Sequence, residues 1–129
     1  MAVTSHATAD VKWESDWDEA FKRARSENKP VLVSFYADWC VWCQHLESIT
    51  FKDQKVAATL SERVVPLGVD IDHSSRELLQ RYRIEAPPTV VVLAPSGDEL
   101  GRILGYMPPT GFLARVQGIL GEVPAGSSG

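Results

Sequence analysis

Cysteine is almost absent from this chain, with two residues in 129, and methionine is equally scarce. Small scaffolds held together by disulfides are short and rich in cysteine, so the composition excludes that class. A zinc site would need two ligands besides the two cysteines. The three histidines, His6, His45 and His73, do not lie at zinc-finger spacing. We therefore expect no metal site.

Basic clusters and long apolar runs are missing as well. The formal net charge is -4, and lysine and arginine are scattered along the chain. Nucleic-acid binding needs a concentrated basic face, so we expect no nucleic-acid partner. No apolar run approaches the ~20 residues that cross a bilayer, and residues 1–10 contain no hydrophobic signal core. The chain is thus expected to be cytoplasmic, or exported with its signal or anchor removed.

The length and composition are those of one soluble domain. A hydrophobic fraction of 44% and a charged fraction of 23% are ordinary for a globular protein that buries a core. We expect a flexible N-terminal lead over residues 1–14, one domain over residues 15–121, and a flexible tail over residues 122–129, which is rich in glycine and serine.

Hydrophobic periodicity predicts an alternating order of helices and strands. Ser15 is expected to begin the first helix and Asp53 to cap the third. Alternation of this kind is typical of a partly parallel sheet with helices on both faces, and the last two strands form a hairpin at its edge. We expect helices over 15–28, 40–51, 54–60, 76–82 and 111–120, and strands over 31–36, 64–71, 89–93 and 99–104.

Both cysteines belong to one motif, WCVWC, over residues 39–43. It follows an apolar strand and precedes a helical pattern. Two thiols at Cys-x-x-Cys spacing, where a strand leads into a helix, are typical of a dithiol/disulfide redox site. The free N–H groups at a helix N-terminus favour a thiolate, so Cys40 is the expected nucleophile. Cys43, one helical turn further on, is expected to resolve the mixed disulfide.

Glu47 and two tryptophans are the other candidates near the motif. Glu47 follows Cys43 by four residues, so it lies on the same helix face and is a candidate acceptor for the thiol proton. A solvated surface glutamate is the alternative. Trp42 is expected to be exposed and to contact a partner, with local packing as the alternative. Trp39 is expected to pack beneath the site, and His45 to be solvated.

The order of elements and two motifs resemble the thioredoxin family. Residues 39–43 resemble its active site, and residues 86–89, Ala-Pro-Pro-Thr, resemble its substrate-binding loop. The resemblance covers roughly residues 15–121 and implies the thioredoxin fold, an α/β fold with a central mixed sheet and helices on both faces. It also implies a cis peptide bond before Pro88, just ahead of the strand that begins at Thr89. The backbone of Pro87 would then lie close to Cys40 and pair with a substrate peptide.

Within that family, residues 36–43 followed by Thr50-Phe51 are most similar to the C-terminal, periplasmic domain of the thiol reductant conductor DsbD and to related small exported proteins. The resemblance therefore favours a periplasmic or otherwise exported protein. Two departures stand out. Cytosolic thioredoxins have Gly-Pro where residues 41–42 are Val-Trp, and the family's buried aspartate, six residues before the first cysteine, is Ser34 here. An acidic residue at the position of Glu47 is shared with the DsbD domain.

These observations predict a thiol:disulfide oxidoreductase that needs no cofactor. The resemblance is to reducing members, and strong oxidants of the superfamily carry a histidine between the cysteines, so we expect a reductase of protein disulfides. Its expected partners are protein disulfide substrates and an upstream thiol donor, and we expect a monomer. The alternatives are a disulfide isomerase or oxidase, a docking module, and a protein that handles a soft ion such as Cu(I).

Overall fold

The structure is a computed structural model that describes residues 11–121. Its single sheet has the strand order β2-β1-β3-β4. β1 pairs in parallel with β2 and antiparallel with β3, and β3 pairs antiparallel with β4. The predicted mixed sheet with a terminal hairpin is therefore confirmed. The strands are β1 Val31–Tyr36, β2 Val65–Asp70, β3 Thr89–Leu93 and β4 Glu99–Leu104.

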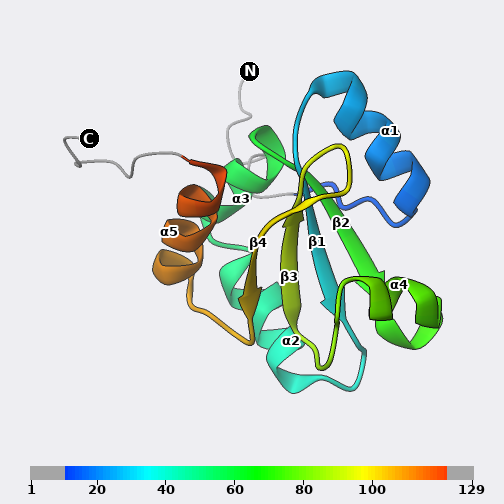
Figure 1. The fold of residues 1–129 in the computed structure, drawn as a ribbon. Helices are drawn as coiled ribbons and strands as arrows, with labels where there is room; N and C mark the ends of the chain where they lie inside the picture. The colour runs from blue at the N-terminus through cyan, green and yellow to red at the C-terminus, as the bar shows by residue number, and fades with distance from the viewer. Residues whose placement is uncertain (1–10, 122–129) are drawn as a thin grey trace.

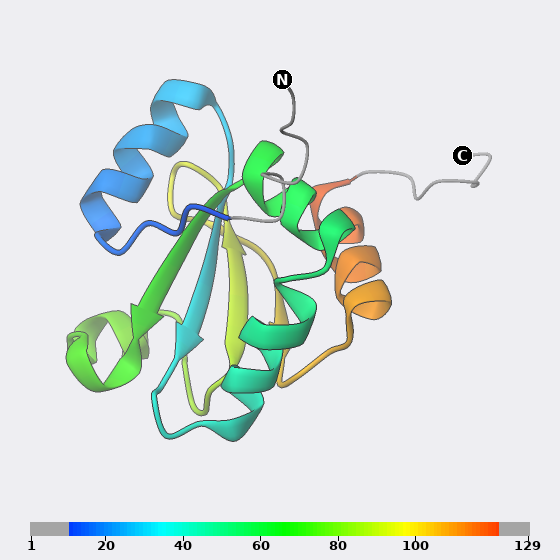
Figure 2. The same ribbon diagram turned by 180° about the vertical axis from the view of Figure 1, so that it is seen from behind.

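Helices cover both faces of the sheet, as expected (Figure 1). The helices α1 and α4 pack on one face, and α3 and α5 pack on the other. The view from behind shows the same layers, with α2 at one end of the sheet (Figure 2). Within residues 11–121, no helix has the length and apolar character needed to cross a membrane. The helices are α1 Trp17–Glu27, α2 Val41–His45, α3 Gln54–Glu62, α4 Arg76–Arg81 and α5 Pro109–Leu120.

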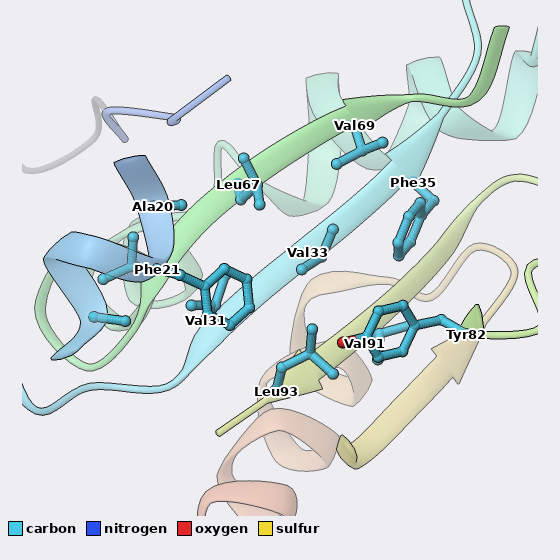
Figure 3. Packing of buried hydrophobic residues seen from close by; sticks show 12 residues of the cluster. Ala20, Phe21, Val31, Val33, Phe35, Leu67, Val69, Tyr82, Val91 and Leu93 are labelled. Carbon is cyan, nitrogen blue, oxygen red and sulfur yellow. The ribbon is translucent and has the colours of Figure 1, made fainter. Parts of the chain in front are cut away.

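The central strand β1 is buried on both faces, which explains its nearly continuous apolar sequence. Successive side chains of a strand point to opposite faces. Val33 and Phe35 accordingly face α1, whereas Leu32 faces α3 and α5. Figure 3 shows the first of these clusters, in which the side chains of α1, the central strands and Tyr82 meet. Ser34 is the one polar residue of β1, and it alternates onto the face of α3 and α5.

Two helix starts differ from the expected ones. The cap of α1 is Asp16 rather than Ser15, because the Asp16 carboxylate accepts the N–H of Asp18. The last helix begins at Pro109, two residues earlier than expected, since proline suits the first helical position. Asp53 caps α3 as predicted: its carboxylate accepts two backbone N–H groups.

The helix that follows the cysteines changes geometry partway, which the sequence pattern did not indicate. After α2 it continues as a π-helical segment, Leu46–Thr50. The N–H of Phe51 donates to the carbonyl of Leu46 at 2.9 Å, a bond that spans five residues. Short π-helical segments inside helices are frequent at functional sites. This segment carries Glu47.

Residues 11–14, expected within a flexible lead, instead pack against the domain. The N–H of Glu14 donates to the carbonyl of Pro66 at 2.8 Å, and the carbonyl of Glu14 accepts the N–H of Gly68 at 2.9 Å. Trp13 packs against the core on the side of α3 and α5. The edge of β2 therefore holds this segment in place. The remainder of the expected lead and the expected tail, residues 1–10 and 122–129, lie outside the described residues.

Strand register brings three chain segments together at one end of the sheet. Thr89, the first residue of β3, lies opposite Phe35 near the end of β1. Asp70, the last residue of β2, lies opposite Tyr36. The loops that leave β1 and β2 and the loop that enters β3 are therefore neighbours. In both ribbon views, α2 and the loop before β3 lie at this end (Figures 1 and 2).

We expect Phe35→Ala to lower the free energy of unfolding by about 3–5 kcal/mol, because a fully buried ring is lost and a cavity remains. Leu100→Ala on β4 is the control: this residue is 48% exposed, and its loss should cost less than about 1 kcal/mol. Urea unfolding followed by circular dichroism measures both values. Equal losses in the two variants would contradict the proposed core.

Candidate active site

Cys40 and Cys43 are joined by a disulfide at the start of α2. Cys40 occupies the N-cap position, and its sulfur accepts the N–H of Cys43 at 3.1 Å. The N–H of Cys40 donates to the carbonyl of Ala37 at 3.1 Å, which closes the turn between β1 and α2. The helix terminus thus directs a backbone N–H group at the first sulfur, where it stabilises a thiolate once the pair is reduced.

Both cysteines lie in an apolar setting. Cys40 is 6% and Cys43 is 2% exposed, and they form a small cluster with Ala37. Tyr36 and Ile71 pack against this cluster from the ends of β1 and β2. Cys40 is therefore the slightly more exposed residue of the pair, and Cys43 is almost fully buried. This difference fits an attacking and a resolving thiol.

Trp39 does not pack beneath the site as expected. It is 64% exposed, and its indole N–H donates to the carboxylate of Asp72 at 2.8 Å. The reason is the turn before α2, which directs the ring towards the loop that follows β2. At the start of that loop, the carboxylate of Asp70, the last residue of β2, accepts the N–H of Asp72 at 2.9 Å and contacts His73 at 3.0 Å. The contact raises the pKa of His73 and lowers that of Asp70.

Trp42 is 57% exposed, in agreement with the expectation. Its ring lies 5.2 Å from that of His45 and 5.6 Å from that of Tyr106. His45 is thus half-buried against two aromatic rings, which corrects the expectation that it is solvated. The hydroxyl of Thr50 donates to the carbonyl of Met107 at 2.7 Å and ties the Tyr106 loop to the π-helical segment.

The peptide bond between Pro87 and Pro88 is cis, as the resemblance implied. Pro88 is buried and Pro87 is half-buried. The hydroxyl of Thr89 donates to the carbonyl of Ala86 at 2.7 Å, and the carbonyl of Pro88 accepts the N–H of Gly105 at 2.9 Å. These bonds fix the loop at the end of the sheet that carries α2.

A cavity of about 360 Å³ lies beside the π-helical segment, and both Ser34 and Glu47 line it. Ser34 is 5% exposed, and it places a hydroxyl rather than a carboxylate on this cavity. Glu47 is exposed as a residue, yet burial of its carboxyl, aided by the negative charge of Asp38, raises its pKa. The cavity therefore places an acid of raised proton affinity next to the position where the family has its buried aspartate.

The structure does not join Glu47 directly to Cys43. No hydrogen bond links the two among the described residues, and Tyr36 borders both the cysteine cluster and the cavity. The negative charge of Glu47 contributes to the raised pKa of Tyr36, whose first cause is burial. A proton that passes from Cys43 to Glu47 in this geometry needs water as a carrier.

Sequence reasoning missed two residues at this site, and it misjudged Trp39. Asp72 was not singled out because it lies 33 residues from its partner Trp39. Trp13, which lines the cavity, belongs to a segment that has no periodic pattern.

Among residues 11–121, no group of three or more His, Cys, Asp or Glu side chains is arranged to hold a metal ion.

Comparison with known proteins agrees with this geometry. A family model described as a thioredoxin-like domain matches residues 17–119. The thiol:disulfide interchange protein DsbD of Ralstonia nicotianae is 36% identical over 119 residues, which are 89% of this chain and 19% of that protein. The chain spans about a fifth of the length of the curated relatives it matches.

Solved structures show the same fold. A thioredoxin from Thermus thermophilus superposes with a TM-score of 0.77 at 30% identity, covering 85% of this chain and 87% of that one. The oxidised C-terminal domain of Neisseria meningitidis DsbD gives a TM-score of 0.69 at 27% identity, covering 83% of this chain and 98% of that one.

The fold and the disulfide define a thioredoxin-fold domain with a redox-active Cys-x-x-Cys site, which is the site of a thiol:disulfide oxidoreductase. The chain belongs to the thioredoxin-like domain family, and its sequence relatives within that family include DsbD proteins.

The raised pKa of Glu47 predicts how Glu47→Gln changes stability. Between the ordinary carboxyl pKa and the raised one, the folded state binds more protons than the unfolded state, so stability falls as pH rises. Gln cannot ionise, so the variant should gain stability over this range, by at most about 1 kcal/mol because solvent still screens the group. Urea unfolding from pH 4 to 8 measures the difference, with Glu62→Gln on α3 as an exposed control. A gain that is independent of pH would contradict the assignment.

Proposed function

We propose that this domain acts as a reductase of protein disulfides. The observation that carries the proposal is the position of the Cys40–Cys43 pair. It caps α2 at the end of the sheet where the cis Pro87–Pro88 loop also lies. This arrangement supplies an activated first thiol, a shielded second thiol and an adjacent backbone that a substrate peptide can contact.

The reaction proceeds through a mixed disulfide. The Cys40 thiolate attacks one sulfur of the substrate disulfide, and the other substrate sulfur leaves as a thiolate. The Cys43 thiolate then attacks the Cys40 sulfur, which forms the intramolecular disulfide and releases the second substrate sulfur. Two electrons pass from the dithiol to the substrate, and a thiol donor must then reduce the oxidised pair again.

Glu47 is proposed to accept the proton of Cys43 in the second step. Its raised pKa brings the carboxyl closer to the working pH, which favours general base catalysis. Ser34 occupies the position of the usual aspartate and offers no base. Of the carboxyl groups that line the cavity, that of Glu47 is nearest in sequence to the cysteines. The cavity provides the space for a water that carries the proton past Tyr36.

The proposed substrate surface consists of Trp39, Trp42, Pro87, Pro88 and Thr89. The exposed rings of the two tryptophans offer apolar area on either side of the motif. Pro87 is half-buried, so its backbone stays available to a peptide in extended conformation. Pro88 and Thr89 act by holding this backbone in place through their own hydrogen bonds.

The DsbD relatives support the remaining parts of the proposal. Their name, thiol:disulfide interchange protein, fits protein substrates and an upstream thiol donor. The same relationship supports the proposal of an exported or periplasmic location, with a cytoplasmic reductase as the alternative. The expected monomeric state stays a prediction.

The reduction potential of the Cys40–Cys43 pair tests the direction of the reaction. We expect a value near or below about -270 mV, that of thioredoxin, from equilibration with glutathione or dithiothreitol buffers. Trp39 and Trp42 adjoin the cysteines, so tryptophan fluorescence should report the transition. A potential of about -180 to -120 mV would instead indicate an isomerase or oxidase. The absence of any redox transition would reject the enzyme and favour a docking or metal-handling role.

Two substitutions test the order of the steps. Cys43→Ser should stop after the first attack and accumulate a mixed disulfide on Cys40, whereas Cys40→Ser should reduce turnover to background. Mass spectrometry of the variants after incubation with a disulfide-containing protein measures the adduct. Full turnover by Cys43→Ser would contradict the two-thiol mechanism.

A further inference from the structure

The cavity that holds the Glu47 carboxyl is closed on one side by the segment 11–15. The sheet forms a second side through Ser34, Tyr36 and Gly68, and the end of the π-helical segment forms the third. Gly68 contributes no side chain, which keeps the space open above β2. The residues that line the cavity are Val11, Trp13, Glu14, Ser15, Ser34, Tyr36, Glu47, Phe51, Lys52 and Gly68.

Backbone hydrogen bonds and an ion pair hold the segment 11–15 against the rest of the domain. Glu14 forms an isolated parallel bridge with Leu67 at the edge of β2 through its N–H and its carbonyl. The Glu14 carboxylate also pairs with Arg23 of α1 at 3.1 Å, and both side chains are about 30% exposed. The segment therefore has one fixed point, at residue 14, directly beside the cavity.

The side chain of Trp13 is a second fixed point of the segment, because it packs against the wall of the cavity that Phe51 forms. Its ring lies 5.0 Å from that of Phe51, which is 4% exposed and in turn contacts the ring of Phe112 at 5.6 Å. Phe51 directly follows the π-helical segment and lies four residues after Glu47. Trp13 thus connects the segment 11–15 to the helical turn that carries the carboxyl.

We propose that Trp13 is a positioning residue for Glu47: by packing on Phe51 it keeps the segment 11–15 closed over the cavity and limits the access of water to the carboxyl. The consequence for the exchange reaction rests on the proposed function, in which Glu47 accepts the proton of Cys43. A carboxylate that water solvates freely is a weaker base than one that is partly desolvated. Trp13 therefore influences the proton affinity of the Glu47 carboxyl through the access of water, and not through a direct contact between the two side chains.

The other charged and titratable groups around Glu47 come from four elements. Asp38 lies in the turn before α2 and adds negative charge, and Tyr36 of β1 adjoins the cavity. Lys52, just after the π-helical segment, has the opposite sign, and Glu14 is engaged by Arg23. Substitution of Trp13 changes none of these charges, so a change in the proton affinity of Glu47 reports the access of water.

The test uses Trp13→Ala and Trp13→Leu, with Trp13→Phe as the variant that keeps a ring on Phe51. Trp17→Ala is the matched control: that tryptophan stacks on Phe21 at 4.9 Å in the cluster on the other face of the sheet. The pKa of Glu47 is read from carboxyl ¹³C NMR titration of glutamate-labelled protein, with the resonance assigned by its loss in Glu47→Gln. Circular dichroism checks the fold of each variant, and Trp13→Leu keeps the test available where alanine prevents folding.

We expect the pKa of Glu47 to fall towards its ordinary value in Trp13→Ala and Trp13→Leu, to return in Trp13→Phe, and to stay unchanged in Trp17→Ala. The acid limb of the pH profile for single-turnover reduction of a disulfide peptide should move with it. An unchanged Glu47 pKa in folded Trp13→Ala, or an equal fall in Trp17→Ala, overturns the inference.

The failure of the proposed function has a different signature. If the Glu47 pKa falls in Trp13→Ala while Glu47→Gln leaves the pH profile of the reaction unaltered, the control of Glu47 by Trp13 is supported. The role of Glu47 as proton acceptor is then rejected.

Discussion

The pairing of β1 with its two neighbours is the constraint on which the rest of this molecule depends. β1 is buried on both faces and lies between a parallel and an antiparallel partner. That combination places the ends of β1 and β2 and the start of β3 at one end of the sheet. The cysteines, the Trp39–Asp72 contact and the cis-proline loop all belong to these three connections. The site is therefore assembled by strand direction rather than by nearness in sequence.

The sheet carries the neutral Ser34 at the position where the family has a buried aspartate, so the charge next to the cysteines differs from that of the family. An ionised carboxylate buried at this position would carry a larger desolvation cost than the hydroxyl of Ser34. Glu47 lines the same cavity as Ser34, and burial, together with the negative charge of Asp38, raises the pKa of its carboxyl. The π-helical segment carries this carboxyl, and the segment 11–15 lines the same cavity, so both elements adjoin the site although they lie outside the motif.

Much of the fold was predictable because local patterns and burial agree. The β-branched run of β3, the Asp53 cap and the hairpin before β4 each follow from nearby residues, and all are confirmed. The π-helical turn was not predictable, because a change from four-residue to five-residue hydrogen-bond spacing over one turn shifts the apolar pattern by only about one residue. The outward position of Trp39 depends on the carboxylate of Asp72, and the packing of His45 depends on the ring of Tyr106, both of which are distant in sequence.

The sequence alone determined the chemistry: two cysteines at Cys-x-x-Cys spacing between a strand and a helix, and a proline pair before a β-branched strand. Residue type and short-range spacing are sufficient for such features, because the groups involved lie within one helical turn or one loop. Tertiary structure alone decided what surrounds them. It brought Glu47 and the segment 11–15 to one cavity, turned Trp39 towards Asp72 and brought Tyr106 against Trp42. Burial and long-range contact arise only when the sheet has formed, so no local pattern encodes them.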